Sequence, residues 1–321
     1  MNKLLWCGVA MAGALAAPVV LAQAYPAKAI RVIVPSSPGG GTDILARVIA
    51  ARLTEAWGQQ VVVENRAGAG QMIGIELAAK AAPDGYSLLM AASTLAINPV
   101  MYKKVPYDAL RDFAPITQAA ALPNILVAHP SLPVKNVKEL VALAKARPGQ
   151  LVYASAGHGT SPHLSFELFL YMTGTKMIHV PYKGTGPGAV DTVAGQVQLM
   201  MPNLLTALPH VKSGRLRALG VTSAKRSAGV PDVPTIAQAG VPGYEAIQWY
   251  GLLAPAGTPR EIVTKLHGEI VKILAAPDTR EKLSSDGAEP VGSTPEQFAA
   301  FIRAETDKWG KVVKAAGIQP E

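Results

Sequence analysis

The sequence predicts an α/β protein with two sheets, each flanked by helices. Short apolar segments of strand type alternate with segments whose apolar residues recur every three or four positions. The alternation breaks off once and then restarts, and 321 residues are enough for two domains. Because strands that alternate with helices tend to pair in parallel, we expect parallel or mixed sheets with helices on both faces.

Residues 1–24 have the pattern of an export signal. Lys3 gives the positive start, residues 4–21 the apolar stretch, and Ala22-Gln23-Ala24 a cleavage site of the A-x-A type. The small residues at its end argue against a retained membrane anchor, and Cys7 lies too early to carry a lipid anchor. We therefore expect cleavage after Ala24 and a periplasmic protein, with no cysteine left after cleavage.

The net charge of the full chain is +8 at pH 7, but its basic residues are dispersed. The longest cluster is a pair such as Lys103-Lys104, and no basic stripe is interleaved with aromatic residues. This pattern argues against a nucleic-acid partner and allows a weak positive field that attracts small anions. A solvated surface with surplus lysine explains the charge equally well.

The first run of alternation covers the segment after the signal. The expected elements are a strand at 30–35, a helix whose apolar face includes residues 44–53, a strand at 61–64, an Ala-rich helix ending at 82, and a strand at 87–92. A less regular stretch, 98–123, follows. The alternation restarts with strands at 125–128, 151–154, 177–181, 197–201 and 216–222, and helices at 137–146, from 162 to about 171, and after 184.

The pattern changes again near residue 247. A strand at 247–254 is followed by three helices, 259–274, 279–285 and 295–314. Helices without a sheet of their own must pack on an earlier domain. We therefore expect one domain of residues 25–126 plus 249–321, a second of residues 127–248, and a ligand cleft between them.

Two strand-to-helix loops share one design. Residues 35–43 and 154–164 both combine glycine with hydroxyl side chains and lead into a helix N-terminus. Unpaired N–H groups and the positive end of the helix dipole attract an anion there, and glycine lets a ligand approach the backbone. The alternative is an ordinary capped connection with Thr42 or Asp43 as N-cap. Asp43 also has two other possible roles, as a sensor of a ligand amine or a holder of ordered water.

Known catalytic and phosphate motifs are absent from the sequence. There is no G-x-G-x-x-G, no P-loop, no nucleophile elbow at Ser155 and no H-E-x-x-H. His158, His163 and Glu167 have weak spacing for zinc, and no second cluster supports them. We expect His163 to be a hydrogen-bonding residue beside its loop, and we expect neither a metal nor a cofactor.

Several segments occur in a characteristic order along the chain. They are Tyr25-Pro26 with Lys28, residues 35–43, Val63-Glu64-Asn65-Arg66 through Gly70, Pro83-Asp84-Gly85-Tyr86, residues 153–164, Val180-Pro181-Tyr182-Lys183-Gly184, Gly195-Gln196-Val197, Ala207-Leu208-Pro209-His210, residues 216–219 and residues 249–259. With these segments, essentially the whole chain after residue 24 resembles the tripartite tricarboxylate transporter receptor family, also called the Bug family.

The resemblance implies a two-domain receptor of the periplasmic-binding-protein type (type II), which closes on its ligand like a flytrap and is not an enzyme. It implies a small carboxylate ligand: a di- or tricarboxylate, an aromatic acid or an acidic amino acid. It implies integral membrane transporter subunits, or in some members a sensor protein, as partners, and we expect a monomer. The ligand-binding residues implied are Ser36, Gly40, Gly41, Thr42, Asp43, Ser93, Thr94, Ser155, Gly157, His158, Gly159, Thr160, His163, Tyr182 and Asn203.

Two positions depart from the family pattern. Position 158 is His where relatives often have Asn or another small polar residue, and position 203 is Asn where many have Asp. A protonated His158 would pair with a carboxylate, whereas a neutral one would donate a single hydrogen bond. The missing carboxylate at position 203 predicts a preference for anionic ligands without an amine.

Two other classes of protein are compatible with the residues. One is a periplasmic hydrolase or isomerase acting on a small carboxylate with His158 or His163 as base. The other is an interaction protein that binds a protein partner and no small acid. Substrate turnover lost on His→Ala substitution would indicate the enzyme.

Overall fold

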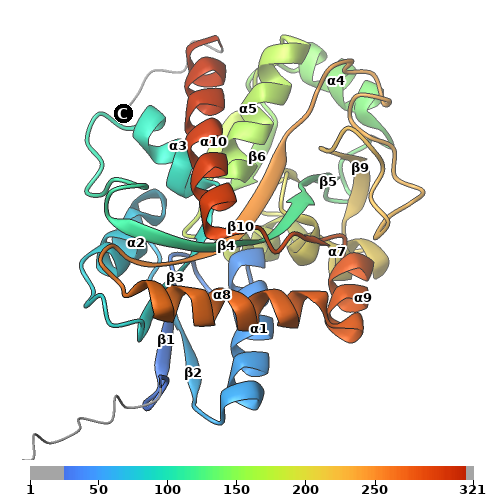
Figure 1. Cartoon of the computed structure of the whole chain (residues 1–321). Coiled ribbons are helices and arrows are strands. Elements are labelled where there is room, and N and C mark those ends of the chain that lie inside the picture. The colour runs from blue at the N-terminus through green and yellow to red at the C-terminus, as the bar shows by residue number, and fades with distance from the viewer. Residues whose placement is uncertain (1–24, 316–321) are drawn as a thin grey trace, which may run out of the picture.

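The computed structural model describes residues 25–315, so the predicted signal and its cleavage site lie outside the described residues. The described chain forms two mixed sheets flanked by helices (Figure 1), which confirms the predicted fold class. Within residues 25–315, no helix is both long and apolar enough to cross a bilayer.

The first sheet has six strands in the order β11-β4-β10-β3-β1-β2. β1 pairs in parallel with β2 and β3, whereas β10 is antiparallel to β3 and β4. The strands are β1 (Ile30–Val34), β2 (Val61–Asn65), β3 (Ser87–Ala92), β4 (Phe113–Pro123), β10 (Ile247–Pro255) and β11 (Glu289–Pro290).

Helices cover both faces of this sheet because alternate residues of its strands are apolar on both sides. α1 (Gly41–Trp57) and α8 (Arg260–Ala275) pack on the face of Val32 and Leu252. α2 (Met72–Ala79), α3 (Thr94–Met101) and α10 (Pro295–Ala315) pack on the face of Ile33 and Trp249. A 3₁₀ turn, η1 (Ala69–Gln71), precedes α2, and α9 (Pro277–Ser285) follows α8.

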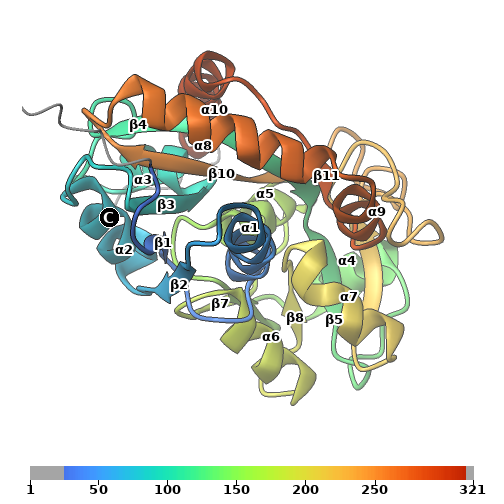
Figure 2. The ribbon, with the colours of Figure 1, turned by 60° about the horizontal axis from the view of Figure 1, so that its bottom comes forward.

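The second sheet has five strands in the order β7-β6-β8-β5-β9. They are β5 (Ile125–Ala128), β6 (Val152–Ser155), β7 (Ile178–Pro181), β8 (Leu199–Met200) and β9 (Arg217–Val221). One face packs against α4 (Val137–Ala146) and α5 (Ser161–Thr173), and the other against α6 (Thr185–Val193) and α7 (Leu204–Lys212). Figure 2 shows α1 of the first sheet beside α7 of the second.

The chain passes from the first sheet to the second at Asn124 and returns at Ile247. Asn124 is fully buried, and its backbone N–H donates to Thr222 Oγ1 at 2.8 Å. Its side-chain Nδ2 donates to Ser161 Oγ at 2.8 Å and to Ser165 Oγ at 2.9 Å, both on α5. The first crossing is therefore anchored to the helix that follows the second glycine-rich loop.

The expectation of a less regular stretch over residues 98–123 holds only for residues 102–112 and was wrong at both ends. The structure has α3 continuing to Met101 and an eleven-residue strand, β4. Pro99 cannot donate a hydrogen bond to Leu95 O, but the Tyr107 hydroxyl donates to that oxygen at 3.4 Å, so the helix tolerates the proline. The sequence-based list of elements also lacked α7 and β11.

Candidate functional site

The first glycine-rich loop leads from β1 into α1. Gly40 is the N-cap residue, and no side chain hydrogen-bonds to the cap. The interpretation of Thr42 or Asp43 as N-cap was therefore wrong: both lie in the first helical turn, because the helix already begins at Gly41. The N–H groups at such a helix start have no acceptor within the helix, which leaves them available to an anion.

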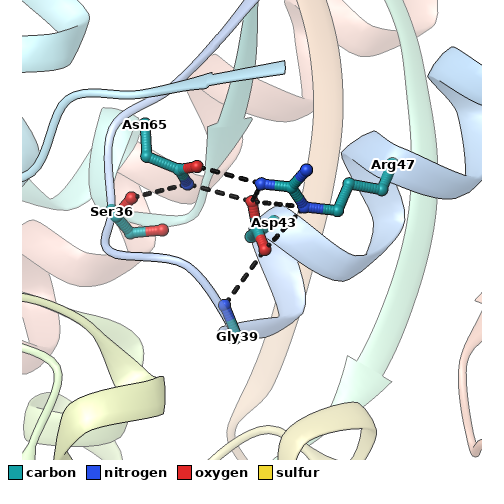
Figure 3. Close-up of polar contacts among 5 residues, drawn as sticks. All are labelled: Ser36, Gly39, Asp43, Arg47 and Asn65. Atoms are coloured by element: carbon teal, nitrogen blue, oxygen red, sulfur yellow. Dashed lines mark hydrogen bonds and ion pairs between the residues drawn. The ribbon is translucent and has the colours of Figure 1, made fainter. Parts of the chain in front are cut away.

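Asp43 holds this loop in shape instead of capping the helix (Figure 3). Its carboxylate accepts hydrogen bonds from the backbone N–H of Gly39 at 3.0 Å and from Asn65 Nδ2 at 3.0 Å. It also forms an ion pair with Arg47 at 3.0 Å. Burial raises the pKa of the Asp43 carboxyl, but the hydrogen bonds from Arg47, Gly39 and Asn65 outweigh it and bring the pKa below its usual range. The carboxylate therefore stays charged and is already occupied by protein donors.

The second glycine-rich loop leads from β6 into α5 and is held by its own hydroxyl groups. Ser155 Oγ accepts from the Gly157 N–H at 3.1 Å, and Thr160 Oγ1 donates to Gly157 O at 2.6 Å. Gly157 has φ +122° and Gly159 has φ +68°, conformations that favour glycine. Thr160 is the N-cap of α5, again without a side-chain hydrogen bond to the cap.

The two loops face one small cavity between the two sheets. Pro35 of the first loop and Ala156 of the second line the same small cavity of about 40 Å³. The Ser37 hydroxyl donates to Lys183 O at 2.8 Å, and the Tyr102 hydroxyl donates to His158 O at 3.3 Å. A cavity of this size holds no more than a few water molecules, so a dicarboxylate reaches these loops only when they separate.

Buried polar atoms without a protein partner gather around this junction. Among the described residues, the buried side-chain atoms that find no hydrogen bond include Ser36 Oγ on the first loop and Gln71 Oε1, which lines the small cavity. Asn98 Oδ1 and Asn124 Oδ1 belong to the same group. An unmade hydrogen bond of a buried group costs roughly 1–3 kcal/mol, so this arrangement suits a polar ligand with its water.

Other predicted ligand residues have protein partners. The Ser93 hydroxyl donates to Gln248 Oε1 at 2.6 Å, while Thr94 opens α3 and is buried. The Tyr182 hydroxyl donates to Asp191 Oδ2 at 2.7 Å; burial and this carboxylate raise its pKa to about 12. Asn203 caps α7, because its Oδ1 accepts from Thr206 N at 3.0 Å.

Asn203 nevertheless lies against the first loop. A Cβ atom added to Gly41 would lie 2.5 Å from Asn203 Oδ1 and 2.5 Å from Tyr250 Oη. Tyr250 is fully buried, and its hydroxyl hydrogen-bonds with the side chains of Gln248 and Thr42. The start of α1 is therefore packed between β10 of the first sheet and the N-cap of α7, which belongs to the second.

Three histidines, one of them in the second loop, lie close together. The rings of His163 and His179 stack with centroids 4.2 Å apart, and His158 meets both edge-on. Burial and the neighbouring His158 lower the pKa of His179 to about 4, and burial with both neighbours brings the pKa of His163 well below its usual range. As expected, His163 is a hydrogen-bonding residue: its Nδ1 accepts from the Gly159 N–H at 3.2 Å.

Ser155 and His179 are the pair that the enzyme alternative would use. Ser155 Oγ lies 2.6 Å from His179 Nε2, a distance suited to a nucleophile and its base. The Ser155 side chain is fully buried and also bonded to its own loop, so a substrate would reach it only when the two loops separate. Glu167, the nearest carboxylate to His163, accepts a hydrogen bond from the Tyr153 hydroxyl.

Several residues of the site were missed by sequence reasoning. His179, Gln71 and Asn98 reach the loops from other elements, and Asn65 holds Asp43. A usable signal existed for Asn65, which belongs to one of the family-like segments, and His179 directly precedes another. No local pattern marks Gln71 or Asn98.

The geometry defines a class: a solute-binding protein with two mixed α/β sheets whose loops meet around a polar junction. The family model described as "Tripartite tricarboxylate transporter family receptor" matches residues 45–318. The chain is 42% identical over 311 residues to protein BugT of Bordetella pertussis, a match that covers 96% of this chain and 95% of BugT.

Solved structures agree. Rpa4515 of Rhodopseudomonas palustris with adipate has a TM-score of 0.90 at 41% identity, covering 92% of this chain and all of that one. MatC from Rhodopseudomonas palustris with bound malate has a TM-score of 0.86 at 33% identity, covering 90% of this chain and all of that one. The chain therefore belongs to the tripartite tricarboxylate transporter receptor family and is a solute-binding receptor.

Proposed function

We propose that this receptor captures a small dicarboxylate between two lobes in the periplasm and delivers it to the membrane subunits of a tripartite tricarboxylate-type transporter or to a sensor protein. The lobes are residues 25–126 with 249–321, and 127–248, and the signal is removed after Ala24. The observation that carries the proposal is the junction of two glycine-rich helix starts, one from each sheet. The adipate and malate bound to the two relatives fit a site of this kind.

The mechanism follows from the contacts at the junction. One carboxylate takes hydrogen bonds from the N–H groups at the starts of α1 and α5 and from hydroxyls such as Ser36 Oγ. Contacts such as Ser37 to Lys183 form only when the lobes approach, so a ligand that bridges both loops shifts the population toward the closed form. The closed form then presents one continuous surface to the membrane partner.

A thermal-shift screen tests the proposal. The protein is unfolded and refolded to remove carried-over ligand, then melted with citrate, malate, adipate, aspartate, glutamate, benzoate, terephthalate and nicotinate. A ligand that binds only the folded state stabilises it by about 2.7 kcal/mol at one hundred times its dissociation constant. We expect a dicarboxylate to raise Tm most, and the absence of any shift with every acid would overturn the proposal.

A matched pair of variants links such a hit to the junction. Gly159→Val places a side chain against Asn98 Oδ1, since even a Cβ there would be 3.2 Å away. Gly149→Val has the same backbone strain, because φ is +70° against +68°, but its Cβ meets nothing within 4 Å. We expect only Gly159→Val to abolish the ligand-induced shift; equal behaviour of the two variants would place the ligand elsewhere.

Asn203 provides a test of ligand charge. We expect the wild-type protein to bind adipate about tenfold more tightly than 2-aminoadipate, the factor that 1.4 kcal/mol gives, because no carboxylate at position 203 offsets desolvation of the ammonium. Asn203→Asp keeps an N-cap for α7, so this variant should fold normally, and its affinities for adipate and 2-aminoadipate should differ less. Calorimetric titration with both ligands measures the ratio of the two affinities. Equal affinities of the wild-type protein for the two ligands would contradict the expectation.

A further inference from the structure

Half of the six histidines of this chain converge at one point. His158 comes from the second loop, His163 from the first turn of α5 and His179 from β7. One ring nitrogen of each lies within 4.8 Å of the others. We call His158, His163 and His179 the three-histidine cluster.

Part of this arrangement has a structural explanation. His163, His179, Tyr153 and Phe166 form one continuous stack of rings, with centroids 4.2, 4.9 and 3.9 Å apart along it. Stacking therefore accounts for the positions of His163 and His179. His158 is outside the stack and turns its ring edge-on toward both of them, which completes the cluster.

The rings of the cluster have hydrogen-bond partners around them. Ser155 Oγ lies 2.6 Å from His179 Nε2, a contact of the kind that orients a metal-bound imidazole from its other nitrogen. The Gly159 N–H donates to His163 Nδ1 at 3.2 Å. A neutral imidazole has one lone pair, so an ion bound to His163 would replace this hydrogen bond.

We propose that the three-histidine cluster binds one divalent first-row transition-metal ion, with Zn²⁺ as the reference ion, leaving a further coordination position for water or a ligand carboxylate. Imidazole is a preferred ligand of zinc, copper and nickel, and three histidines plus one open position is a known zinc arrangement. The sequence argued against a metal because His158, His163 and Glu167 have weak spacing for zinc. The fold brings His179 on β7 beside the first two.

Binding requires the rings to draw together. Nitrogens around a tetrahedral ion with bonds of about 2.1 Å lie roughly 3.4 Å apart, closer than the 4.8 Å limit of the cluster. His158 stands between Gly157 and Gly159, whose backbone is the least restricted of all residues, so the loop can bring its ring inward. The ion would then fix the loop that we assign to carboxylate binding.

Metal titration of the whole protein tests the proposal. The protein is purified without a histidine tag, treated with EDTA and dialysed, and titrated with ZnCl₂ by calorimetry; Co²⁺ gives an absorption spectrum that reports coordination geometry. We expect one ion per chain and at least a 100-fold loss of affinity in His158→Asn. His210→Asn is the matched control, because His210 is also half-buried but lies on α7 outside the cluster.

The two variants distinguish a supporting result from one that overturns the proposal. One-to-one binding lost in His158→Asn and kept in His210→Asn supports the site. No saturable binding, or equal affinity in both variants, overturns it, provided that circular dichroism shows both variants folded. The carboxylate screen is run in EDTA, so its failure and the failure of the metal site are distinguishable.

Discussion

Replacing Gly41 with alanine is expected to weaken ligand binding by roughly 5- to 150-fold, the factor that corresponds to an overpacking cost of 1–3 kcal/mol. The added Cβ would sit 2.5 Å from Asn203 Oδ1 and 2.5 Å from Tyr250 Oη, and both partners are buried. Asn203 approaches Gly41 from the second sheet, so the strain opposes closure of the two loops. Calorimetric titration with the best dicarboxylate measures the effect.

The control for this substitution is Gly268→Ala. Gly268 lies within α8, and a Cβ there would meet nothing within 4 Å. Alanine is favoured over glycine inside a helix by about 1 kcal/mol, so this variant should melt slightly higher and bind normally. If Gly41→Ala binds as tightly as Gly268→Ala, the start of α1 does not limit closure, and the role proposed for it is wrong.

Replacing Asp43 with alanine is expected to cost stability and affinity together. The change removes the acceptor of the Gly39 N–H and one of the two acceptors of Asn65 Nδ2, which still donates to Ser36 O. It also removes the buried carboxylate that shapes the first loop. A hydrogen bond to a charged group contributes about 1.5–3 kcal/mol, and we expect a loss of at least that size in the free energy of unfolding. Denaturant melts measure it, and a carboxylate titration measures the accompanying loss of affinity.

Asp43→Asn removes the charge of this side chain but keeps its shape, and so tests how much of the stability depends on the charge. The pKa of Asp43 lies below its ordinary value, so its carboxylate stabilises the fold above the unfolded pKa of about 3.9, and this contribution is lost as pH falls through the folded pKa. Asp43→Asn should therefore be less stable than wild type at pH 5–7. The difference between their free energies of unfolding should become smaller below about pH 4. If this difference in the free energy of unfolding is the same at pH 3 and pH 7, the charge of Asp43 does not stabilise the fold.

The sequence predicted the two glycine-rich loops because their pattern is local. Glycine, serine and threonine between a strand and a helix mark 35–43 and 154–164 whatever the rest of the chain does, and both segments form the expected loops. Local patterns failed where pairing decides the structure. β4 contains Pro115, Pro123 and several alanines, so its β-propensity is low. β4 is extended because β10 pairs along its whole length. On its other side β11 pairs only with Ala120 and Ala121, so Pro115 faces no strand on that side and its missing N–H is tolerated.

The roles of individual side chains also depend partly on local sequence and partly on contacts made by the fold. The sequence identified Asp43 as a candidate cap or ligand contact, but only the fold places Asn65 of β2 beside it and so makes it a support for the loop. His163 and His179 are separated by the rest of α5 and a turn, and their stacking depends on β7 pairing in parallel with β6.

What the sequence by itself determined is therefore most of the strands and helices, the two glycine-rich helix starts and the family, because each follows from residues close together in the chain. Only the tertiary structure decided which buried polar atoms gather at the loop junction, which candidate residues are already occupied by protein partners, and that three histidines converge. These depend on contacts between residues far apart in the chain, and periodicity carries no information about such contacts.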